Sequence, residues 1–450
     1  MNELDKIIKG GYCIGCGTCA SACPSNIKMI ENKEQKYEAK VFKELDDSQL
    51  RKALKVCSFS NEGLNEDEIG EKVFDLSEVS KGDVIGYYKS LYAGHVVADD
   101  LRSKATSGGI ITWTLDQLLK NNLIDAVIHV KGSEKEGTIF EYGISKTTEE
   151  IIQGAKSRYY PVELSEVMEY VLKNDLRFAF VGLPCFVKSA RKYAMVDPVI
   201  NERLKFFVGL VCGHLKSKAF AEYVGWQAGI TPGELKYIDF RYKIPDKPAD
   251  SYGIQVEDKQ GNKKVMVAKE TLGTNWGLGY FKYEACDYCD DIFSETADIA
   301  VGDAWLKHYT KDSKGNSVVI SRNKTIDLLL EKGIQTKELQ LDVLSDEAMR
   351  DAQGGGFRHR RVALGYRLYL KQKKNLWFPH KRVKVDKNSI SGPYKLIFRF
   401  RVYIRDKSTE YWMKSRESGN FMDFEKKMKL PGQVYQMLLN GVGFIKKIKK

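Results

Sequence analysis

Nine cysteines are the residues of this 450-residue chain with the clearest capacity for chemistry. Four of them form the run C-I-G-C-G-T-C-A-S-A-C-P, as Cys13, Cys16, Cys19 and Cys23. Thiolates at this spacing can wrap one face of an iron–sulfur cube, and the glycines between them permit tight turns. We therefore expect a 4Fe-4S cluster here. A structural zinc site is the alternative, although such sites usually pair two C-x2-C units.

The fourth ligand of this cluster is either Cys23 or Cys57. In ferredoxins with two clusters, the cysteine before the proline serves the other cluster, which argues against Cys23. Cys57 lies where the corresponding cysteine of a degenerate second half would fall. We expect the ligands to be Cys13, Cys16, Cys19 and Cys57, with Cys23 a remnant. The assignment with Cys23 as ligand stays open.

The other four thiols could form a second site: Cys185, Cys212, Cys286 and Cys289. Cys185 and Cys212 each follow or end an apolar run, and the last two form C-D-Y-C. Burial as free thiols is the alternative for Cys185 and Cys212, because free cysteine packs like a small hydrophobe. Together the four favour a second 4Fe-4S cluster.

The elements that would position these residues alternate between apolar strands and amphipathic helices. We expect strands at 91–98, 125–130, 177–181, 206–212 and 297–301, and helices from Ser107, at 164–172 and at 186–193. This alternation predicts an α/β (α+β) fold with a mixed, largely parallel sheet. Ligands bind beyond the carboxyl ends of strands in such sheets, where Cys185, Cys212 and Asp303 fall.

Two polar segments could bind an anion or a flat ring. Ser107-Gly108-Gly109 precedes a helix, whose first amides could face a pyrophosphate, although serine is also an ordinary N-cap. Lys156, Ser157 and Arg158 stand before two tyrosines and could grip phosphates, or could form a solvated loop. A G-x-G-x-x-G fingerprint is absent, so no motif predicts nicotinamide binding.

Charge separates the chain into two parts. Residues 357–450 hold 25 Lys and Arg against 6 Asp and Glu, a local net of +19. The whole chain carries +12, which leaves −7 for residues 1–356. The basic part interleaves aromatic residues, as at 398–403, 411–412 and 443–450. It suits an anionic membrane surface, or an extension packed on the acidic body; nucleic-acid binding is a weaker reading, and we expect none.

Composition points to a cytoplasmic protein. Hydrophobic residues make up 43% of the chain, which is ordinary for a globular protein. No run approaches the roughly 18 apolar residues of a membrane-spanning helix. The first residues lack the apolar core of a secretory signal, so we expect a cytoplasmic location, peripheral to the membrane if the basic part binds lipid.

An ordered series of motifs resembles the coenzyme F-420 hydrogenase/dehydrogenase beta-subunit family. The motifs are ATSGGI at 105–110, AKSRYYPV at 155–162, VGLPC at 181–185, GLVCGH at 209–214, CDYCDD at 286–291 and ADIAVGDAW at 297–305. A ferredoxin module often precedes this family's body. The series covers about 12–341; the basic part beyond Gly356 departs from the shorter archaeal subunits and puts their hydrogenase partner in doubt.

The resemblance implies an iron–sulfur flavoprotein with two 4Fe-4S clusters and FAD. Ser107, Gly108 and Gly109 match a turn implied in flavin contact, Lys156, Ser157 and Arg158 a motif near the ring, and Asp303 a G-D motif. The second four cysteines match an inner cluster. Electrons would pass from ferredoxin or another carrier to a substrate. Bacterial relatives with basic extensions suggest a sugar or lipid-linked intermediate of polysaccharide synthesis.

Other functions remain open at this point. The chain could feed electrons to a partner enzyme, reduce a deazaflavin, or hold zinc as a scaffold, and it could form a homo-oligomer. His214, Tyr159 and His308 are candidate proton donors without a motif behind them. We expect a ferredoxin-type domain at 1–60, a linker at 61–83, a flavin-side domain at 84–163, a second-cluster domain at 164–345, a glycine hinge at 354–356 and the extension at 357–450.

Overall fold

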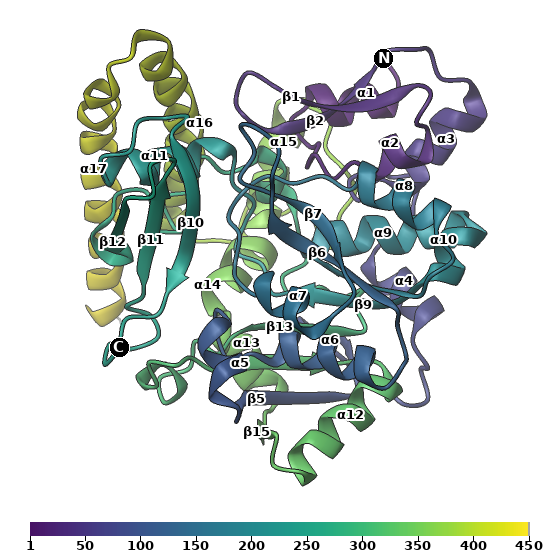
Figure 1. Ribbon diagram of the computed structural model, residues 1–450. Helices are drawn as coiled ribbons and strands as arrows, with labels where there is room; N and C mark the ends of the chain where they lie inside the picture. Colours follow the sequence, from purple (N-terminus) through teal and green to yellow (C-terminus); the bar gives the residue numbers. More distant parts are fainter. Residues whose placement is uncertain (449–450) are drawn as a thin grey trace.

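The computed structural model describes residues 1–448, with all of their side chains except those of Asp99 and 443–448. The N-terminal module comprises α1 (Glu3–Lys9), α2 (Thr18–Ala22), β1 (Ile27–Glu31), β2 (Tyr37–Val41) and α3 (Asp47–Val56). β1 and β2 form an antiparallel pair, shown in purple in Figure 1. Asp46 and Gln49 form a capping box that starts α3, which ends at Cys57. The basic segment at 443–450 lies outside the described side chains.

The segment expected to be a linker is folded. It contains α4 (Glu66–Val73) and β3 (Ser80–Gly82), which pairs with β4 (Gly86–Tyr88). Glu66 at the start of α4 is only 5% exposed. Its carboxylate pairs with Lys188 at 2.9 Å and Arg382 at 3.2 Å. These buried ion pairs tie residues 61–83 to both the body and the extension.

An eight-stranded mixed sheet forms the centre of the body. Its strands are β5 (Ser90–Val96), β6 (Ala126–Gly132), β7 (Phe140–Ser145), β8 (Phe178–Gly182), β9 (Leu204–Leu210), β13 (Ile299–Asp303), β14 (Ser317–Ser321) and β15 (Leu339–Val343). The order is β15-β5-β14-β13-β9-β8-β6-β7. Parallel pairing within this sheet joins four adjacent strands, β13, β9, β8 and β6. The expected α/β fold is confirmed, and its parallel part is the middle of the sheet, since both flanks are antiparallel.

Helices cover both faces of this sheet. They are α5 (Asp99–Lys104), α6 (Ile110–Lys120), α7 (Thr148–Gln153), α8 (Ser165–Lys173), α9 (Pro184–Val196), α10 (Pro198–Arg203), α12 (Lys324–Gln335) and α13 (Asp346–Ala352). Successive strand residues point to opposite faces, so Val208 packs in the core with α6 and α12, and Phe207 in the core with α8 and α9. The expected strands and helices therefore all form, within a few residues of their expected bounds.

A smaller sheet lies beside the body in Figure 1. It consists of β10 (Leu235–Tyr242), β11 (Gly253–Asp258) and β12 (Lys263–Val267), preceded by α11 (Lys218–Gln227). Three short 3-10 turns follow: η1 (Ala268–Glu270), η2 (Glu284–Tyr288) and η3 (Tyr309–Lys311). The η2 turn carries the C-D-Y-C sequence, and its cysteines lie close to the ends of the central strands.

The basic extension is helical and packs into the main core. It comprises α14 (Gly354–Phe357), the π-helical turn η4 (Arg358–Val362), α15 (Leu364–Lys373), α16 (Gly392–Ser418) and α17 (Phe421–Ile448). Trp412 of α16 is fully buried against Tyr223, Phe281 and Phe424. The three glycines expected as a hinge form α14 instead. Within residues 1–448, no helix is long and apolar enough to span a bilayer.

Candidate functional site

The first cysteine set consists of Cys13, Cys16, Cys19 and Cys57, which the fold brings together. The thiols of Cys13 and Cys19 each interact electrostatically with those of Cys16 and Cys57. Two glycines with positive φ, Gly15 (+69°) and Gly17 (+83°), turn the backbone between the first three. A Cβ on Gly15 would lie 2.3 Å from the carbonyl oxygen of Tyr37, so only glycine fits there.

Cys23 lies apart from this set. Its thiol donates to the carbonyl oxygen of Gln49 at 3.4 Å on α3. The charged groups that act on it are Lys52 and Asp46, and no other thiol is among them. This placement favours Cys57 over Cys23 as the fourth ligand of the first set.

The second cysteine set consists of Cys185, Cys212, Cys286 and Cys289. Cys185 occupies the first turn of α9, and Cys212 follows β9, so both lie at carboxyl ends of central strands. The Cys185 thiol interacts electrostatically with the three other thiols of the set. The backbone N–H of Leu215 donates to Cys286 Sγ at 3.2 Å, as amides do at thiolates in iron–sulfur sites.

Helix α9 joins the two sets. Besides Cys185, it carries Ser189, whose Oγ accepts from the Cys16 thiol at 3.6 Å, and Lys192, whose ammonium donates to the carbonyl oxygen of Cys57. The Cys16 thiol also acts electrostatically on the Cys185 thiol. Tyr142 of β7 faces both of these thiols. The two sets are therefore neighbours, with one helix fixing their separation.

Burial makes these thiols poor acids. It raises the pKa of Cys13 to about 12 and raises the pKa values of Cys57, Cys185 and Cys286. Such groups are neutral unless a bound cation replaces the proton, and soft thiolates select iron–sulfur clusters or zinc. Among the described side chains, no three of His, Cys, Asp or Glu converge around a point suited to a single metal ion.

Three arginines of the extension hold the second set. Arg360 donates to Cys289 Sγ at 3.1 Å and to Cys212 Sγ at 3.5 Å. Arg367 donates to the carbonyl oxygen of Asp287 at 2.6 Å, and Arg405 pairs with the Asp287 carboxylate. Asp287 also pairs with Lys282 at 2.5 Å. Basic extension and acidic body thus meet at the C-D-Y-C turn, in agreement with the expectation that one packs on the other.

A cavity of about 810 Å³ opens beside the second set. Cys212 lines it, as does Tyr142, and α6 contributes the apolar side chains of Ile110, Ile111 and Leu115. The C-terminal part contributes residues 351–356, Arg358, His359 and Arg401. Binding sites for small molecules and cofactors are typically cavities of roughly 300–1,000 Å³ with a few placed polar groups, and this cavity falls in that class.

The Ser107 turn lies at the wall of this cavity. Ser107 and Gly109 line it, and Gly109 with φ +84° precedes α6 without a side-chain cap, so the first amides of α6 stay available. Gly108 does not line the cavity. Its amide donates to Ser317 Oγ at 3.0 Å, and a Cβ there would lie 2.4 Å from the carbonyl oxygen of Gly94. Gly108 therefore allows close packing of the turn on β5 and β14.

Lys156, Ser157 and Arg158 also line the cavity. Lys156 pairs with Asp239 at 2.9 Å, and the Ser157 amide donates to Thr106 Oγ1 at 2.8 Å. The Arg158 guanidinium stacks 4.6 Å over Phe140, and its buried Nε and Nη1 have no hydrogen-bond partner among the described residues. An unpartnered buried guanidinium is costly unless an anion completes it.

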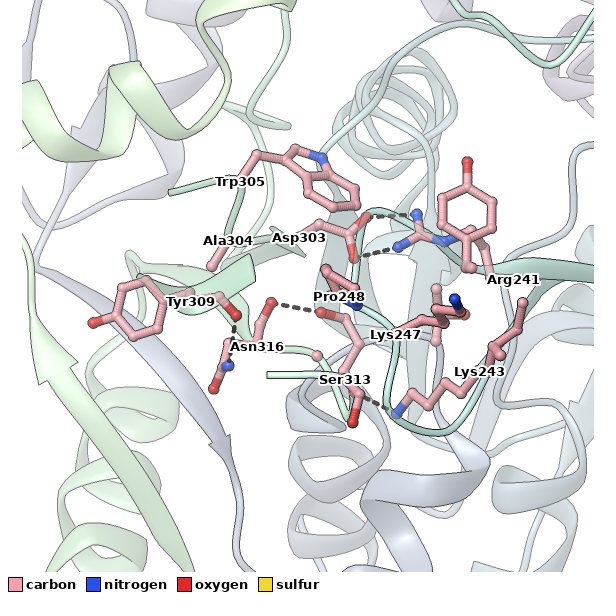
Figure 2. Close-up of a pocket in the computed structure, with 16 residues that line it drawn as sticks. Arg241, Lys243, Lys247, Pro248, Asp303, Ala304, Trp305, Tyr309, Ser313 and Asn316 are labelled. Atoms are coloured by element: carbon pink, nitrogen blue, oxygen red, sulfur yellow. Dashed lines mark hydrogen bonds and ion pairs between the residues drawn. The ribbon is translucent and has the colours of Figure 1, made fainter. Parts of the chain in front are cut away.

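The carboxylate of Asp303 pairs with another side chain of the protein. Figure 2 shows its carboxylate facing the Arg241 guanidinium, with two hydrogen bonds of 2.9 and 3.0 Å. The Arg241 guanidinium lies 4.1 Å from the Tyr252 ring and 5.1 Å from the Trp305 ring, and Lys243 lies nearby. Lys243 donates to the carbonyl oxygens of Arg102 and Ser107. Burial, with Lys156 and Arg102 nearby, lowers the pKa of Lys243 to about 7.

Two of the three candidate proton donors reach the cavity. Tyr159 and His214 line it, and Trp276 lies between them with ring centroids 4.7 and 4.3 Å away. His214 Nε2 is buried without a described partner, and burial holds its pKa well below the usual range. His308 is exposed and lines neither the cavity nor the basic pocket in Figure 2.

Sequence reasoning missed several groups here. Arg360, Arg241 and Lys216 carry no motif, and the first was counted only as part of a basic extension. Lys216 is 1% exposed, lines the cavity and donates to the carbonyl oxygen of Tyr280 at 2.6 Å. It pairs with no carboxylate of the described chain. Its position close in sequence to the motif that contains Cys212 was the one signal that could have identified Lys216.

A ferredoxin-type cysteine loop, joined to an α/β body whose cavity opens beside further cysteines, is the arrangement of an iron–sulfur protein. Residues 7–28 match the 4Fe-4S binding domain model, which confirms the expected ferredoxin-type module. Residues 91–169 and 175–347 match the N-terminal and C-terminal models of the coenzyme F420 hydrogenase/dehydrogenase beta subunit. The chain therefore belongs to the coenzyme F420 hydrogenase/dehydrogenase beta-subunit family, as the ordered motifs indicated.

Relatives are distant. The coenzyme F420-dependent sulfite reductase of Methanocaldococcus jannaschii is 23% identical over 376 residues, 77% of this chain and 52% of that protein. The chain thus spans about half the length of that relative. The coenzyme F420 hydrogenase subunit beta of Methanothermobacter thermautotrophicus is 21% identical over 52% of this chain and 82% of that subunit.

A solved structure shares the fold. It is a chain of the F420-reducing [NiFe] hydrogenase complex from Methanosarcina barkeri, with a TM-score of 0.50 and 18% identity. The match covers 69% of this chain and all of that one. The basic helices beyond residue 347 lie outside both family models.

Proposed function

We propose that this protein is an iron–sulfur flavoprotein oxidoreductase with two 4Fe-4S clusters, one on each cysteine set. The observation that carries the proposal is the continuous order of sites: the first set, helix α9 with Ser189 at the Cys16 thiol and Cys185 in its first turn, the second set, and Cys212 at the cavity wall. Electrons from ferredoxin or another carrier enter at the first set, where three ligands are only partly buried, and leave through the cavity.

FAD is the cofactor that we propose for the cavity. The volume suits it, the apolar wall suits a flat ring, and the uncapped amides of α6 with Arg158 suit a pyrophosphate. When bound, a flavin converts single electrons from clusters into a two-electron reduction. Ser107, Gly109, Lys156, Ser157 and Arg158 hold the cofactor, and Gly108 and Asp303 support them through Ser317 and Arg241.

The substrate class that we infer is an anion. Arg158, Lys216, Lys243 and Arg401 surround the cavity and its adjoining pocket, and none pairs with a carboxylate of the described residues. Burying cations without partners costs free energy that a bound anion recovers. Burial lowers the pKa of Lys216 well below its usual range and that of Lys243 to about 7, so holding both lysines in their charged forms beside the two arginines needs an anion in addition to one pyrophosphate. A phosphate-bearing sugar or lipid-linked intermediate, which the resemblance suggests, provides the remaining charge.

Metal and flavin analysis of protein purified without oxygen tests the relay. We expect about eight iron, eight sulfide and one FAD per chain. Zinc without flavin would overturn the proposal. About four iron with one FAD would leave one cluster, and separate Cys57→Ala and Cys212→Ala variants would identify which set holds it.

Binding of inorganic pyrophosphate to the flavin-loaded protein tests the substrate class. Perturbation of the flavin absorbance reports binding in the cavity. We expect Arg401→Gln to weaken it about tenfold, and Arg399→Gln, an exposed change on the same helix that does not line the cavity, to leave it unchanged. Release of flavin by pyrophosphate would show instead that all of these cations serve the cofactor.

A second candidate function is electron transfer to a partner enzyme or to coenzyme F420. It is favoured by the relatives named for coenzyme F420 and by the fold shared with a chain of a multi-subunit hydrogenase complex. Reduction of coenzyme F420 by the dithionite-reduced protein would favour it, whereas oxidation by a phosphate-bearing substrate alone would favour the first. Contact of the basic extension with an anionic membrane remains a further proposal, testable by liposome binding with and without residues 392–450.

A further inference from the structure

Arg360 differs from the other cations of the molecule in what it contacts. It is 2% exposed, and its two terminal nitrogens each touch one sulfur of the second set, Cys289 and Cys212. Each nitrogen also donates to a backbone carbonyl oxygen: Nη1 to Asp291 and Nη2 to Gly213, the latter at 2.7 Å. The guanidinium is thus held between two carbonyls that flank the ligands.

This arrangement fits a cluster bound by the second set. Carbonyl groups of the two ligand loops anchor the guanidinium, so its position does not depend on the sulfurs alone. The terminal nitrogens of the guanidinium also donate to the two sulfurs. Arginine stays protonated when buried. No carboxylate of the described residues pairs with Arg360. Its natural counter-charge is therefore the anionic group that the thiolates hold.

Among the described residues, no guanidinium or ammonium group is hydrogen-bonded to a sulfur of the first set. Lys192 acts electrostatically on the Cys57 thiol, but it donates to the carbonyl oxygen of Cys57, not to a sulfur. The Cys16 thiol instead meets the hydroxyls of Ser189 and Thr18, at 3.6 and 3.5 Å. The two sets therefore differ by one guanidinium in direct contact with sulfur.

We propose that Arg360 sets the reduction potential of the second cluster above that of the first, so that electrons move inward. Net charge and hydrogen bonds to sulfur are the main determinants of cluster potential. When the cluster accepts one electron from the first cluster, its charge becomes one unit more negative, and Arg360 stabilises that reduced form. The inference rests on the proposed second cluster, and it makes Arg360 a positioning and tuning residue supplied by a segment outside both family models.

Redox titration of the full protein, followed by electron paramagnetic resonance, tests this role. We compare the wild type with Arg360→Gln and Arg360→Lys, and the first cluster serves as internal reference. Arg361→Gln is the matched control, because Arg361 lies on the same turn but pairs with Glu295. We expect Arg360→Gln to make the second cluster at least tenfold harder to reduce, which is a 59 mV fall for one electron, and Arg360→Lys to have a smaller effect.

The possible outcomes distinguish failure of the tuning role of Arg360 from failure of the two-cluster relay. If Arg360→Gln keeps eight iron and the reduction potential falls only at the second cluster, the tuning role is supported. If it keeps eight iron and the potential does not fall, or falls equally at both clusters, the tuning role is overturned while the proposed relay stands. A wild type with one cluster overturns the relay and this inference together. If Arg360→Gln loses four iron, the reduction potential of the second cluster in Arg360→Lys becomes the deciding measurement. A fall relative to the wild type supports the tuning role, and an unchanged potential overturns it. Loss of iron from both variants would make Arg360 structural and overturn the tuning role.

Discussion

The two cysteine sets reach similar arrangements by opposite means. The first is built from a loop in which three thiols fall within seven residues, completed by Cys57 at the end of α3. The second gathers thiols from α9, from the end of β9 and from η2, and then needs arginines of the extension to hold the last of these. A local motif can thus position one cluster with glycines, whereas a dispersed set depends on the whole body being folded.

The largest expected effect is the loss of iron from the first set alone. Cys57→Ala should remove about half of the iron, because a cluster deprived of a ligand is lost or becomes labile. Cys23→Ala is the matched control and should keep all of it, since the Cys23 thiol donates to the Gln49 carbonyl oxygen and lies apart from the first set. Iron and sulfide analysis measures both. The reverse pattern would assign Cys23 as the ligand.

A change at Asp287 should act on the second set. Asp287→Asn removes the carboxylate that pairs with buried Lys282 and leaves Arg405 only its pairs with the more exposed Asp406 and Glu284, so we expect a loss of about 3–5 kcal/mol in the free energy of unfolding. Chemical denaturation measures it. The control is Asp406→Asn, because Asp406 pairs with the same Arg405 but is 57% exposed, and it should cost about 1 kcal/mol or less. Equal losses would contradict the clamp on the C-D-Y-C turn.

Replacing a glycine beside each set should reveal a smaller difference between the sets, measured as the free energy of unfolding. Gly15→Ala places a Cβ at φ +69° against the Tyr37 carbonyl, and we expect it to cost at least about 1–2 kcal/mol. Gly213→Ala beside Cys212 should be nearly neutral, because the nearest atom, on Trp276, would lie 3.5 Å from the new Cβ. Thermal unfolding compares the two. A similar cost at both positions would show that the second set is equally constrained locally.

The smallest effect concerns Lys243, which lines the basic pocket that adjoins the cavity. The pKa of Lys243 is lowered to about 7, so Lys243 loses its charge as the pH rises through that value. Affinity for sulfate, whose charge is constant in this range, should fall by up to about tenfold per pH unit above pH 7. Lys243→Met should bind weakly with little pH dependence. Titration of the flavin-loaded protein checks this, and a flat wild-type profile would exclude Lys243 from the anion site.

The sequence predicted the parts of the site that depend on local spacing. The cysteine loop, the strands ending near Cys185 and Cys212, and the turn at Ser107 all follow from periodicity and turn residues. The strand order did not follow, because antiparallel pairing of β14 and β5 depends on contacts far apart in the chain. Arg360 and Arg241 were missed for the same reason: a charged residue acquires its role from the partner that folding supplies.

The extension was the least predictable part. Three glycines suggested a hinge at 354–356, since glycine destabilises isolated helices, yet tertiary packing holds them in α14. Alternating aromatic and basic residues suggested a membrane surface. In the structure, Trp412 fills a pocket of aromatic rings, and Arg367 and Arg405 pair with the body. Composition identified the charge complementarity, but it did not show where the two surfaces meet.

The clamp of extension arginines on the C-D-Y-C turn also gives the protein an order of assembly. Residues beyond 357 leave the ribosome after every cysteine of the second set, so we expect this set to stay accessible to iron delivery until the extension has been made and packs on it. The first set needs no such timing, because its ligands precede every element of the body and three remain partly exposed. Iron and sulfide offered to the folded apoprotein should therefore fill the first set faster than the second, and equal rates would show that the extension opens readily.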